Sequence, residues 1–389
     1  MKILIVSHEY PPIGGGGANA CMNLAREYGN TGHKVVILSA WYEGLEDTET
    51  WDNISIIRVH AKRKHLEHCG FAEMMDFLAK AIPVAKRLER TNNFDICHVF
   101  FAIPSGPIAY ILKKKYKLPY VIRFGGGDIP GFQERFTKVY KFIGPFEKRI
   151  WKCADALVAN SSGLKKLAEG FYNKREILVI PNGVDSRAFS DEEVAEYVKT
   201  KYNDDVIRLL FVSRLIERKG LQFLLPQLND IRCQCRNSGK SVRLSVVGDG
   251  PYREELVRIA KESNVFDIVK FYGQKAKSEL PEYYSQADIF VFPSKKEGMP
   301  NVVLEAMSYG LPVVMTPCEG SSELISDNGF AVPSDEFGKY IVKLACDDAL
   351  REQMGRKSKE IVEGSFQWSL VANQYIKIFT NILSDGDRL

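Results

Sequence analysis

The sequence predicts an α/β protein with two doubly wound parallel sheets, each in its own domain. The prediction rests on the length, the composition, and the alternation of short apolar runs with amphipathic, helix-length segments. At 389 residues, the chain is more than twice as long as a typical domain of about 150 residues, so two domains are expected. Hydrophobic residues at 45% and charged residues at 26% are average for globular proteins, which excludes a disordered or collagen-like chain.

In the first half, apolar β-branched runs alternate with helical patterns. Strands are expected at 3–6, 35–38, 55–59, 96–100, 120–124, 156–159 and 177–179. Helices are expected at 18–28, 71–90 and 107–115, where apolar residues recur with helical spacing. Pro83 predicts a kink or a restart within the second of these helices.

The pattern repeats after Pro181-Asn182-Gly183, a turn signal that marks the expected domain boundary. Strands are then expected at 208–212, 243–247, 269–271, 289–292 and 313–315, and helices from 220 and at 252–260, 278–285 and 302–308. We therefore expect domains at 1–183 and 184–367. An amphipathic helix from Trp368 onward follows the complete second domain, so we expect it to pack outside that domain.

The charge and the cysteines restrict the classes of function. The net charge is only +4, but residues 1–185 carry +7 and the remainder −3, so the first half is the one suited to an anionic surface. A nucleic-acid binder is disfavoured, because the basic residues follow no recognition motif. The eight scattered cysteines form no CxxC pair, and the histidines no ligand cluster, so we expect reduced thiols and no metal site. The N-terminal run begins without a leader pattern and no apolar stretch is long enough to span a bilayer, which favours a cytoplasmic protein.

A glycine cluster, Gly14 to Gly17, follows the first predicted strand and precedes a helix. Its backbone amides suit contact with a phosphate or a sugar, and the alternative is a merely flexible loop. A nicotinamide site is disfavoured, because residues 8–13 separate the strand from the glycines and no acidic residue follows the second strand.

The strongest block runs from 287 to 307. A buried strand ends at Phe292, a loop carries Glu297, and Pro300 suits the first turn of a helix that holds Glu305. Open α/β sheets bind ligands beyond the carboxyl ends of their strands, and helix-start amides hold phosphates. A carboxylate beside such an anion site accepts hydrogen bonds from hydroxyl groups, which indicates a sugar.

This block resembles the E-x7-E block of the retaining nucleotide-sugar glycosyltransferases of family 4. Four other segments are similar to sequences of that family, in the same order along nearly the whole chain: 180–185, 211–220, 246–251 and 366–368, with the glycine cluster at the family's N-terminal loop position. The resemblance implies a GT-B fold, in which two Rossmann-like domains face a cleft and the C-terminal helix, 368–389, crosses back to the first domain. It also implies that the first domain binds the acceptor and the second the donor.

Carried over by position, the resemblance implies that Arg214 and Lys219 neutralise the leaving diphosphate without a metal ion, and that Glu297 binds hydroxyls of the donor sugar. Outside this context the two cations would be interpreted as surface charges. Glu305 would bind the ribose, and the Lys275 loop would lie against the base. The implied donor-binding residues are Gly15, Gly16, Gly248, Lys275, Gly298, Met299, Asn301, Val302 and Glu305.

The chain departs from the family at one position. Gly125 stands where members often carry a histidine near the reacting sugar, and Asp128 is the nearest ionisable replacement, which makes Asp128 a candidate catalytic residue. Segment 132–152 interleaves lysines and arginines with aromatic residues, which indicates either a face for anionic lipid headgroups or a solvated helix surface.

The resemblance implies a retaining, metal-independent glycosyltransferase that requires no cofactor. Its donor is a nucleoside-diphosphate sugar of the UDP or GDP type. Its acceptor is a hydroxyl of a lipid-linked or other saccharide in surface polysaccharide or lipopolysaccharide biosynthesis, reached at the inner face of the plasma membrane. The alternatives are a nucleotide-sugar epimerase on the same scaffold and a non-catalytic sugar-nucleotide-binding subunit.

Overall fold

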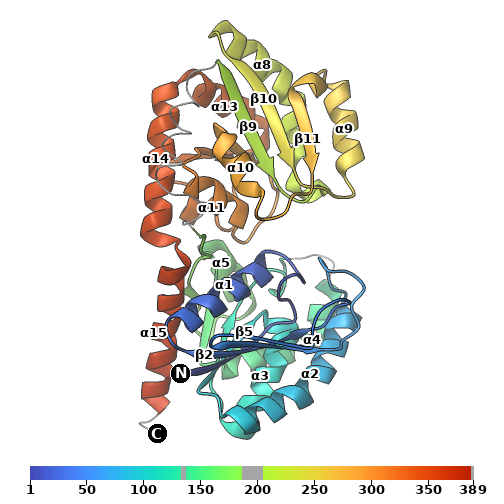
Figure 1. Cartoon of the computed structure of the whole chain (residues 1–389), viewed down its shortest axis with the longest axis vertical. Coiled ribbons are helices and arrows are strands. Elements are labelled where there is room, and N and C mark those ends of the chain that lie inside the picture. The colour runs from blue at the N-terminus through green and yellow to red at the C-terminus, as the bar shows by residue number, and fades with distance from the viewer. Residues whose placement is uncertain (133–136, 186–204, 387–389) are drawn as a thin grey trace. The chain divides into compact units, whose positions relative to one another are not determined.

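The computed structural model describes residues 1–132, 137–185 and 205–386 (Figure 1). They divide into two compact units: unit 1 contains Met1–Asn182 and the C-terminal segment from Trp368, and unit 2 contains Gly183–Gln367. Each unit is built on a mainly parallel sheet with helices between successive strands. The predicted α/β class is therefore confirmed.

Unit 1 has an eight-stranded sheet in the order β3-β4-β2-β1-β5-β6-β7-β8. All neighbouring strands in it are parallel except β3 and β4, which are antiparallel. The sequence reading missed β3, because this short edge strand alternates only exposed and half-buried residues. The strands are β1 (Lys2–Val6), β2 (Lys34–Ala40), β3 (Thr48–Trp51), β4 (Ile54–Val59), β5 (Ile96–Phe100), β6 (Tyr120–Arg123), β7 (Ala156–Ala159) and β8 (Leu178–Val179).

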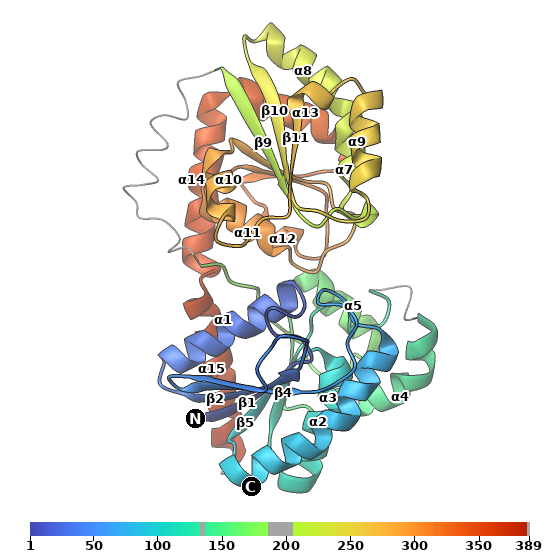
Figure 2. The same cartoon turned by 45° about the vertical axis from the view of Figure 1, so that its right-hand side comes forward.

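Helices cover both faces of this sheet, as the alternation within β1 shows. Ile3 and Ile5 pack in one buried cluster with α1 and α15, while Leu4 and Val6 pack in another with α2, α3, α4 and α5. Figures 1 and 2 show α1 on one side of the sheet and α2 and α3 on the other. The helices are α1 (Gly16–Asn30), α2 (Phe71–Asn92), α3 (Ala102–Tyr116), α4 (Thr137–Cys153), α5 (Ser162–Phe171) and α15 (Trp368–Gly386).

The restart expected at Pro83 does not occur, because α2 continues through this residue as a single helix. Pro83 lies on the exposed side of α2, where water can hydrogen-bond the carbonyl that a proline leaves unpaired.

The C-terminal helix α15 belongs to unit 1, as expected. Tyr375 and Phe379 are buried against α1 and β5, with the Phe379 ring 5.7 Å from that of Tyr28 and the Tyr375 ring 4.7 Å from that of His98. His98 is therefore a packing residue of the core. Among the described residues, no helix is long and apolar enough to cross a membrane.

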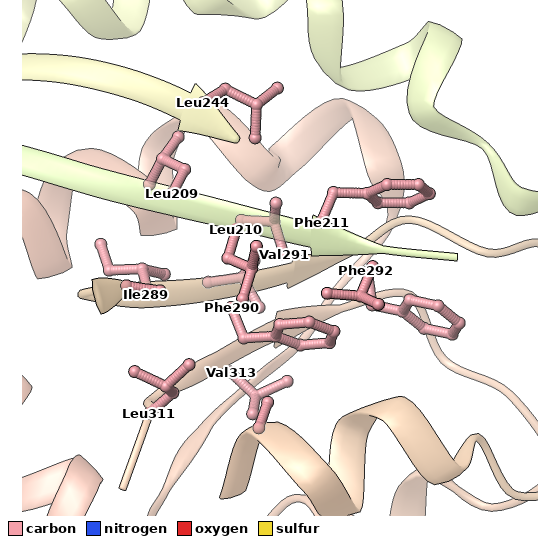
Figure 3. Packing of buried hydrophobic residues seen from close by; sticks show 14 of the residues in the cluster. Leu209, Leu210, Phe211, Leu244, Ile289, Phe290, Val291, Phe292, Leu311 and Val313 are labelled. Carbon is pink, nitrogen blue, oxygen red and sulfur yellow. The ribbon is translucent and has the colours of Figure 1, made fainter. Parts of the chain in front are cut away.

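Unit 2 has a six-stranded sheet in the order β11-β10-β9-β12-β13-β14, with all pairs of neighbouring strands parallel. Consecutive residues of β9 and β12, such as Leu209 and Leu210, are fully buried, which is typical of a sheet covered on both faces. Figure 3 shows how side chains of these central strands pack together. The strands are β9 (Val206–Val212), β10 (Ser241–Val247), β11 (Val269–Gly273), β12 (Ile289–Phe292), β13 (Val313–Met315) and β14 (Gly329–Ala331).

Eight α-helices and four short 3-10 helices are described in unit 2. They are α7 (Leu221–Leu224), α8 (Leu228–Asn237), α9 (Arg253–Glu262), α10 (Leu280–Gln286), α11 (Asn301–Ser308), α12 (Ser321–Leu324), α13 (Phe337–Cys346), α14 (Asp348–Ser365), η3 (Glu217–Lys219), η4 (Leu225–Gln227), η5 (Phe266–Ile268) and η6 (Ser334–Glu336).

Candidate functional site

The order of the unit 2 sheet reverses between β9 and β12, since the strands that follow β9 in sequence lie on one side of it and β12 and its successors on the other. In open α/β sheets, ligands bind beyond the carboxyl ends of the strands at such a point. The loops that leave β9 and β12 carry Arg214, Lys219 and Glu297. The predicted donor residues thus lie at the expected edge of the sheet.

Glu297 and Lys219 contact each other directly. The Glu297 Oε1 atom accepts hydrogen bonds from Lys219 Nζ at 2.7 Å and from Ser294 Oγ at 2.6 Å. Arg218 Nη1 lies 3.5 Å from the same oxygen. The carboxylate and the ammonium are both mostly shielded, with side-chain exposures of 13% and 16%. We call these four residues the charged cluster.

The sequence reading missed Arg218 and Ser294 as members of the charged cluster. Arg218 adjoins Lys219 within the segment that resembles the family, and Ser294 lies three residues before Glu297 in its loop. Their hydrogen bonds are long-range or cross a loop turn, so no periodic pattern in the sequence reveals them.

Backbone contacts lock the loops of the charged cluster together. Lys295 N donates to Arg218 O at 2.9 Å, and the Arg218 guanidinium donates to Lys296 O. Gly220, which ends the 3-10 turn with a φ of +76°, approaches β12 so closely that a Cβ would lie 1.8 Å from Pro293 O. The backbone contacts of its two neighbours, Arg218 and Gly220, therefore set the position of Lys219.

The first part of the β9 loop rests on the turn after β10. Leu215 N donates to Asp249 O at 2.8 Å, and a Cβ at Gly248 would lie 1.9 Å from Ser213 O. Gly248, with a φ of +129°, thus permits close contact between two backbones. Arg214 is exposed in this loop, next to Ser213, so the structure orders its backbone at the same sheet edge as Lys219.

Gly298 and Met299 lead into α11, whose first residues are Asn301 and Val302. Met299 is buried, and the backbone of this turn packs against the segment after β13: a Cβ at Gly320 would lie 2.5 Å from Gly298 O. The first turn of α11 places backbone N–H groups at this end of the helix, which carries no acidic residue. These amides can hold a phosphate.

Glu305 lies one helical turn further along α11, in surroundings unlike those of Glu297. Its Oε2 atom accepts a hydrogen bond from the buried Tyr284 hydroxyl at 2.8 Å. Burial raises the pKa of Glu305, and the hydrogen bond from Tyr284 opposes that rise. The two carboxylates of the block are therefore held by different means, one by cations and one by a phenol.

Lys275 follows β11 and closes a short loop. Its Nζ atom pairs with Glu279 Oε1 at 3.1 Å, and Ala276 N donates to Glu279 Oε2 at 2.8 Å. Hydrogen bonding to Glu279 raises the pKa of Lys275. The loop reaches the sheet edge through Gly273, whose carbonyl accepts from Gly248 N at 2.8 Å.

In unit 1, Gly15 immediately precedes α1 and Gly16 is its first residue, with no acidic side chain in the first turn. Gly14 N donates to Leu66 O at 2.8 Å, so this glycine loop is tied to the segment after β4. The loop supplies helix-start amides at the carboxyl end of β1, which is the arrangement expected for contact with an anion.

Asp128 does not have the surroundings of a residue that acts on substrate. It is buried, its Oδ2 atom accepts from Ala102 N at 2.6 Å, and its Oδ1 atom accepts from Gly125 N at 2.8 Å. Both carboxylate oxygens thus bind backbone amides and join the start of α3 to the loop after β6. These contacts suit a positioning residue, and the catalytic role of Asp128 stays a prediction.

The space beside Gly125 is occupied by an aromatic ring. A Cβ at this position would lie 2.3 Å from Cε1 of Phe101, so a histidine would collide with that ring. The departure from the family at Gly125 therefore accompanies a second residue, Phe101, that the sequence reading passed over.

The basic and aromatic segment after Gly131 is described only in part, because residues 133–136 and the side chain of Lys138 lie outside the described residues. In α4, Phe142 is 86% exposed and Phe146 is 47% exposed, and Lys141, Lys148 and Arg149 are exposed beside them. We call these five residues the α4 face. Trp151 was wrongly assigned to it, since this side chain is fully buried in the core.

In the described part of the chain, no group of three or more His, Cys, Asp or Glu residues is placed to hold a metal ion. Lys219 and Arg218 lie within the charged cluster itself.

Comparisons with known proteins agree with this geometry. A family model described as "Glycosyltransferase Family 4" matches residues 14–187, and one described as "Glycosyl transferases group 1" matches residues 207–347. A Bacillus subtilis protein named as the teichuronic acid biosynthesis glycosyltransferase TuaC is 30% identical over 72% of this chain and 66% of its own.

Solved structures with the same fold cover almost all of the chain. Sucrose-phosphate synthase from Thermosynechococcus elongatus has a TM-score of 0.82 at 21% identity, covering 99% of this chain and 100% of its own. HepE from Anabaena, solved in complex with UDP-glucose, has a TM-score of 0.72 at 20% identity and 100% coverage of both chains. These structures confirm the GT-B fold.

Proposed function

The chain belongs to the glycosyltransferases, with a family 4 domain followed by a group 1 domain, and from this premise we propose that it transfers a sugar, with retention of configuration, from a nucleoside diphosphate to a hydroxyl acceptor. The observation that carries the proposal is the charged cluster, in which Lys219, Arg218 and Glu297 meet at the switch point of the unit 2 sheet. A site of this kind offers both cations for a diphosphate and a carboxylate for hydroxyl groups.

Lys219 donates a hydrogen bond to Glu297 at 2.7 Å. We propose that donor binding exchanges this pair, so that the diphosphate takes the ammonium of Lys219 and the sugar hydroxyls donate to Glu297. Arg218 and Arg214 add positive charge on the same loop. Because charge develops on the diphosphate as the bond to the sugar breaks, these cations stabilise the transition state more than the ground state.

The nucleoside fits the remaining residues of unit 2. The buried Glu305 accepts from ribose hydroxyls, the first turn of α11 holds phosphate oxygens, and the Lys275 loop lies against the base. The donor is of the UDP or GDP type. In the transfer itself, the acceptor oxygen bonds to the anomeric carbon on the face from which the diphosphate departs, and the acceptor proton passes to the departing phosphate oxygen.

The acceptor is the hydroxyl of a lipid-linked saccharide in surface polysaccharide biosynthesis. The name of the TuaC relative supports this choice of pathway. The α4 face supports a lipid-linked substrate, because its exposed phenylalanines and basic residues suit the anionic headgroup region of the inner face of the plasma membrane.

The proposed donor chemistry is tested by incubating the purified chain with a panel of nucleoside-diphosphate sugars and measuring thermal stabilisation and released nucleoside diphosphate. A bound donor raises the unfolding temperature, since it binds only the folded state. We expect release to continue in EDTA. Strict dependence on Mg²⁺ or Mn²⁺ would refute the metal-free mechanism. Conversion of the donor to an epimer without acceptor would indicate an epimerase, and binding without any turnover a non-catalytic subunit.

Liposome flotation tests the membrane contact. Lys141→Glu, Lys148→Glu and Arg149→Glu together should abolish binding to anionic vesicles, because each basic residue near the surface contributes about 1 kcal/mol. The matched control for charge changes three exposed lysines of unit 2 in the same way: Lys261→Glu, Lys270→Glu and Lys339→Glu. Equal recovery of wild type on neutral and anionic vesicles would show that the α4 face is only a solvated surface and would favour a soluble acceptor.

A further inference from the structure

We propose that the Phe101 side chain is the platform on which the sugar ring of the acceptor rests, and that Asp128 is the positioning residue that holds this platform in place. The inference deepens the proposed function, because it assigns the acceptor contact within unit 1. The experiment separates failure of this inference from failure of the proposed function, since sugar binding to unit 1 can be measured without any transfer.

Phe101 lies at the point in unit 1 where ligands bind in sheets of this type. The strand order reverses between β1 and β5, and Phe101 directly follows β5. His8, two residues after β1, contacts it edge-on with ring centroids 5.0 Å apart. A Cβ at Gly125, two residues after β6, would lie 2.3 Å from Cε1 of the same ring. The carboxyl ends of three neighbouring strands thus converge on this ring.

The backbone of Phe101 is strained. Its φ is +69° and its ψ is 119°, a combination that residues with a side chain rarely adopt. Yet the ring is only partly buried, whereas the rings of Phe100 and Phe124 nearby are fully buried. Burial therefore does not account for the strained conformation as it would for a core phenylalanine. Strained residues of this kind cluster at functional sites, where they aim a side chain.

Two glycines make room for the ring. A Cβ at Gly17 would lie 2.4 Å from its Cζ atom, and a Cβ at Gly125 would lie 2.3 Å from its Cε1 atom. The ring is therefore held between the first turn of α1 and the loop after β6. An alanine at either glycine would displace it.

The side chain that contacts the ring edge-on is an uncharged histidine. Burial lowers the pKa of His8 to about 3, with a smaller effect from Arg63, so its imidazole is neutral. Phe101 also packs against the hydrophobic cluster that contains Ile3, Ile5 and Phe100. A neutral aromatic surface of this kind suits the apolar C–H face of a pyranose ring, while the adjacent helix-start amides suit its hydroxyl groups. It does not suit a diphosphate, for which unit 2 supplies the cations.

Asp128 holds the strained backbone at Phe101 in place through two hydrogen bonds. It accepts from Ala102 N, the amide that follows Phe101, and from Gly125 N, the residue against the ring. Phe101 N itself donates to Arg123 O at 3.1 Å. The Asp128 carboxylate therefore holds both the backbone that follows Phe101 and the backbone of Gly125 beside the ring.

The test compares Phe101→Ala and Phe101→Trp with wild type, and Phe266→Ala, a 45% exposed aromatic in unit 2, is the control. With methyl glycosides of common hexoses as acceptor probes, Phe101→Ala should raise the acceptor KM about 10-fold and leave the donor KM and the slow hydrolysis of donor by water unchanged. Phe101→Trp should also raise the acceptor KM, because the larger indole does not fit beside Gly17 and Gly125. An unchanged acceptor KM in Phe101→Ala, or a parallel rise in the donor KM, would overturn the platform.

Saturation-transfer NMR with the same methyl glycosides makes the result independent of turnover. If wild type binds a glycoside and Phe101→Ala does not, the platform stands even where no nucleotide sugar is consumed and the proposed function fails. If Phe101→Ala binds the glycosides as well as wild type does, the platform is wrong even where transfer occurs.

For Asp128, the conservative Asp128→Asn removes one acceptor and should raise the acceptor KM with kcat retained. Because Asp128 acts through the ring, the same change in a Phe101→Ala background should have no further effect on KM. Additive effects would show that Asp128 stabilises the fold or acts elsewhere.

Discussion

The carboxyl ends of the two sheets are built from similar parts but differ in polarity. In unit 2, the loops after β9 and β12 bring Lys219 and Glu297 together at 2.7 Å, with Arg218 beside them. In unit 1, the corresponding ends of β1 and β5 bring together a neutral His8 and the Phe101 ring. Each edge also has a glycine-bearing turn that permits close backbone contact.

The difference shows that one architecture serves two kinds of ligand through the side chains at the strand ends. Carboxylates occur at both edges, yet at the unit 2 edge Glu297 faces cations, while in unit 1 Asp128 is buried against backbone amides. Charge is thus available to a ligand in unit 2 and is used for internal support in unit 1. This is the division expected if the donor diphosphate binds unit 2 and a neutral sugar binds unit 1.

The largest expected effect comes from Glu297→Gln, which tests the charged edge. The change keeps the shape but removes the negative charge that holds Lys219 and receives sugar hydroxyls, so kcat/KM should fall by about 100-fold or more. The thermal unfolding temperature should change little. Glu254→Gln on α9 controls for loss of a surface carboxylate. If kcat/KM for the donor, measured at saturating acceptor, stays near the wild-type value, Glu297 does not belong to the site.

A smaller effect, on stability, is expected in unit 1. Glu147 of α4 is fully buried, and burial, with the nearby Asp128 charge as a lesser cause, raises its pKa to about 9. Above the unfolded pKa near 4.5, the folded state retains a proton that the unfolded state loses, so Glu147 lowers stability progressively as the pH rises toward 9. Glu147→Gln should therefore stabilise the chain at pH 8 by about 1 to 3 kcal/mol, with the gain vanishing near pH 4.5.

Denaturant unfolding of Glu147→Gln and wild type across pH 4.5 to 9 measures this gain, with Glu176→Gln, an exposed residue of unit 1, as the control. A constant difference at all pH values would show that Glu147 titrates normally. In that case, the carboxyl groups beneath the unit 1 edge would be charged like those of unit 2, and the comparison would fail.

The sequence supported the unit 2 edge far better than the unit 1 edge. Lys219, Glu297 and Glu305 stand in short segments where strand, loop and helix follow each other, so local pattern and family resemblance indicate their roles together. Phe101 lies in an ordinary apolar run after β5, and its strained φ and its contacts with Gly17 and Gly125 depend on three distant segments. Asp128 was noticed for its charge, yet only the structure shows that backbone amides bind it.

In the fold too, the elements with a strong local pattern were the ones that the sequence predicted. The central strands, with continuous apolar residues, were predictable, whereas the edge strands β3 and β14 were missed, because they are short and less buried. Trp151 looked like a surface aromatic among lysines, but its helix turns that side chain into the core. Burial of one helical position cannot be judged from charge density along the chain.

The smallest expected effect comes from Tyr284→Phe, which sharpens the comparison within unit 2. Removal of the hydroxyl deletes the 2.8 Å hydrogen bond to Glu305 and with it the contact that opposes the burial-raised pKa of this carboxyl. At a given pH, less Glu305 is then ionised and able to accept from ribose hydroxyls. The donor KM should rise about 2- to 10-fold, since one hydrogen bond contributes about 0.5 to 1.5 kcal/mol net, and kcat should be nearly unchanged. Because protonation is greater at lower pH, the rise should be larger at pH 6 than at pH 8. Tyr340→Phe, which removes a phenol hydroxyl from α13, is the control. A donor KM that does not change at pH 6 would show that Glu305 supports α11 only, and that Glu297 alone supplies the carboxylate chemistry of the unit 2 edge.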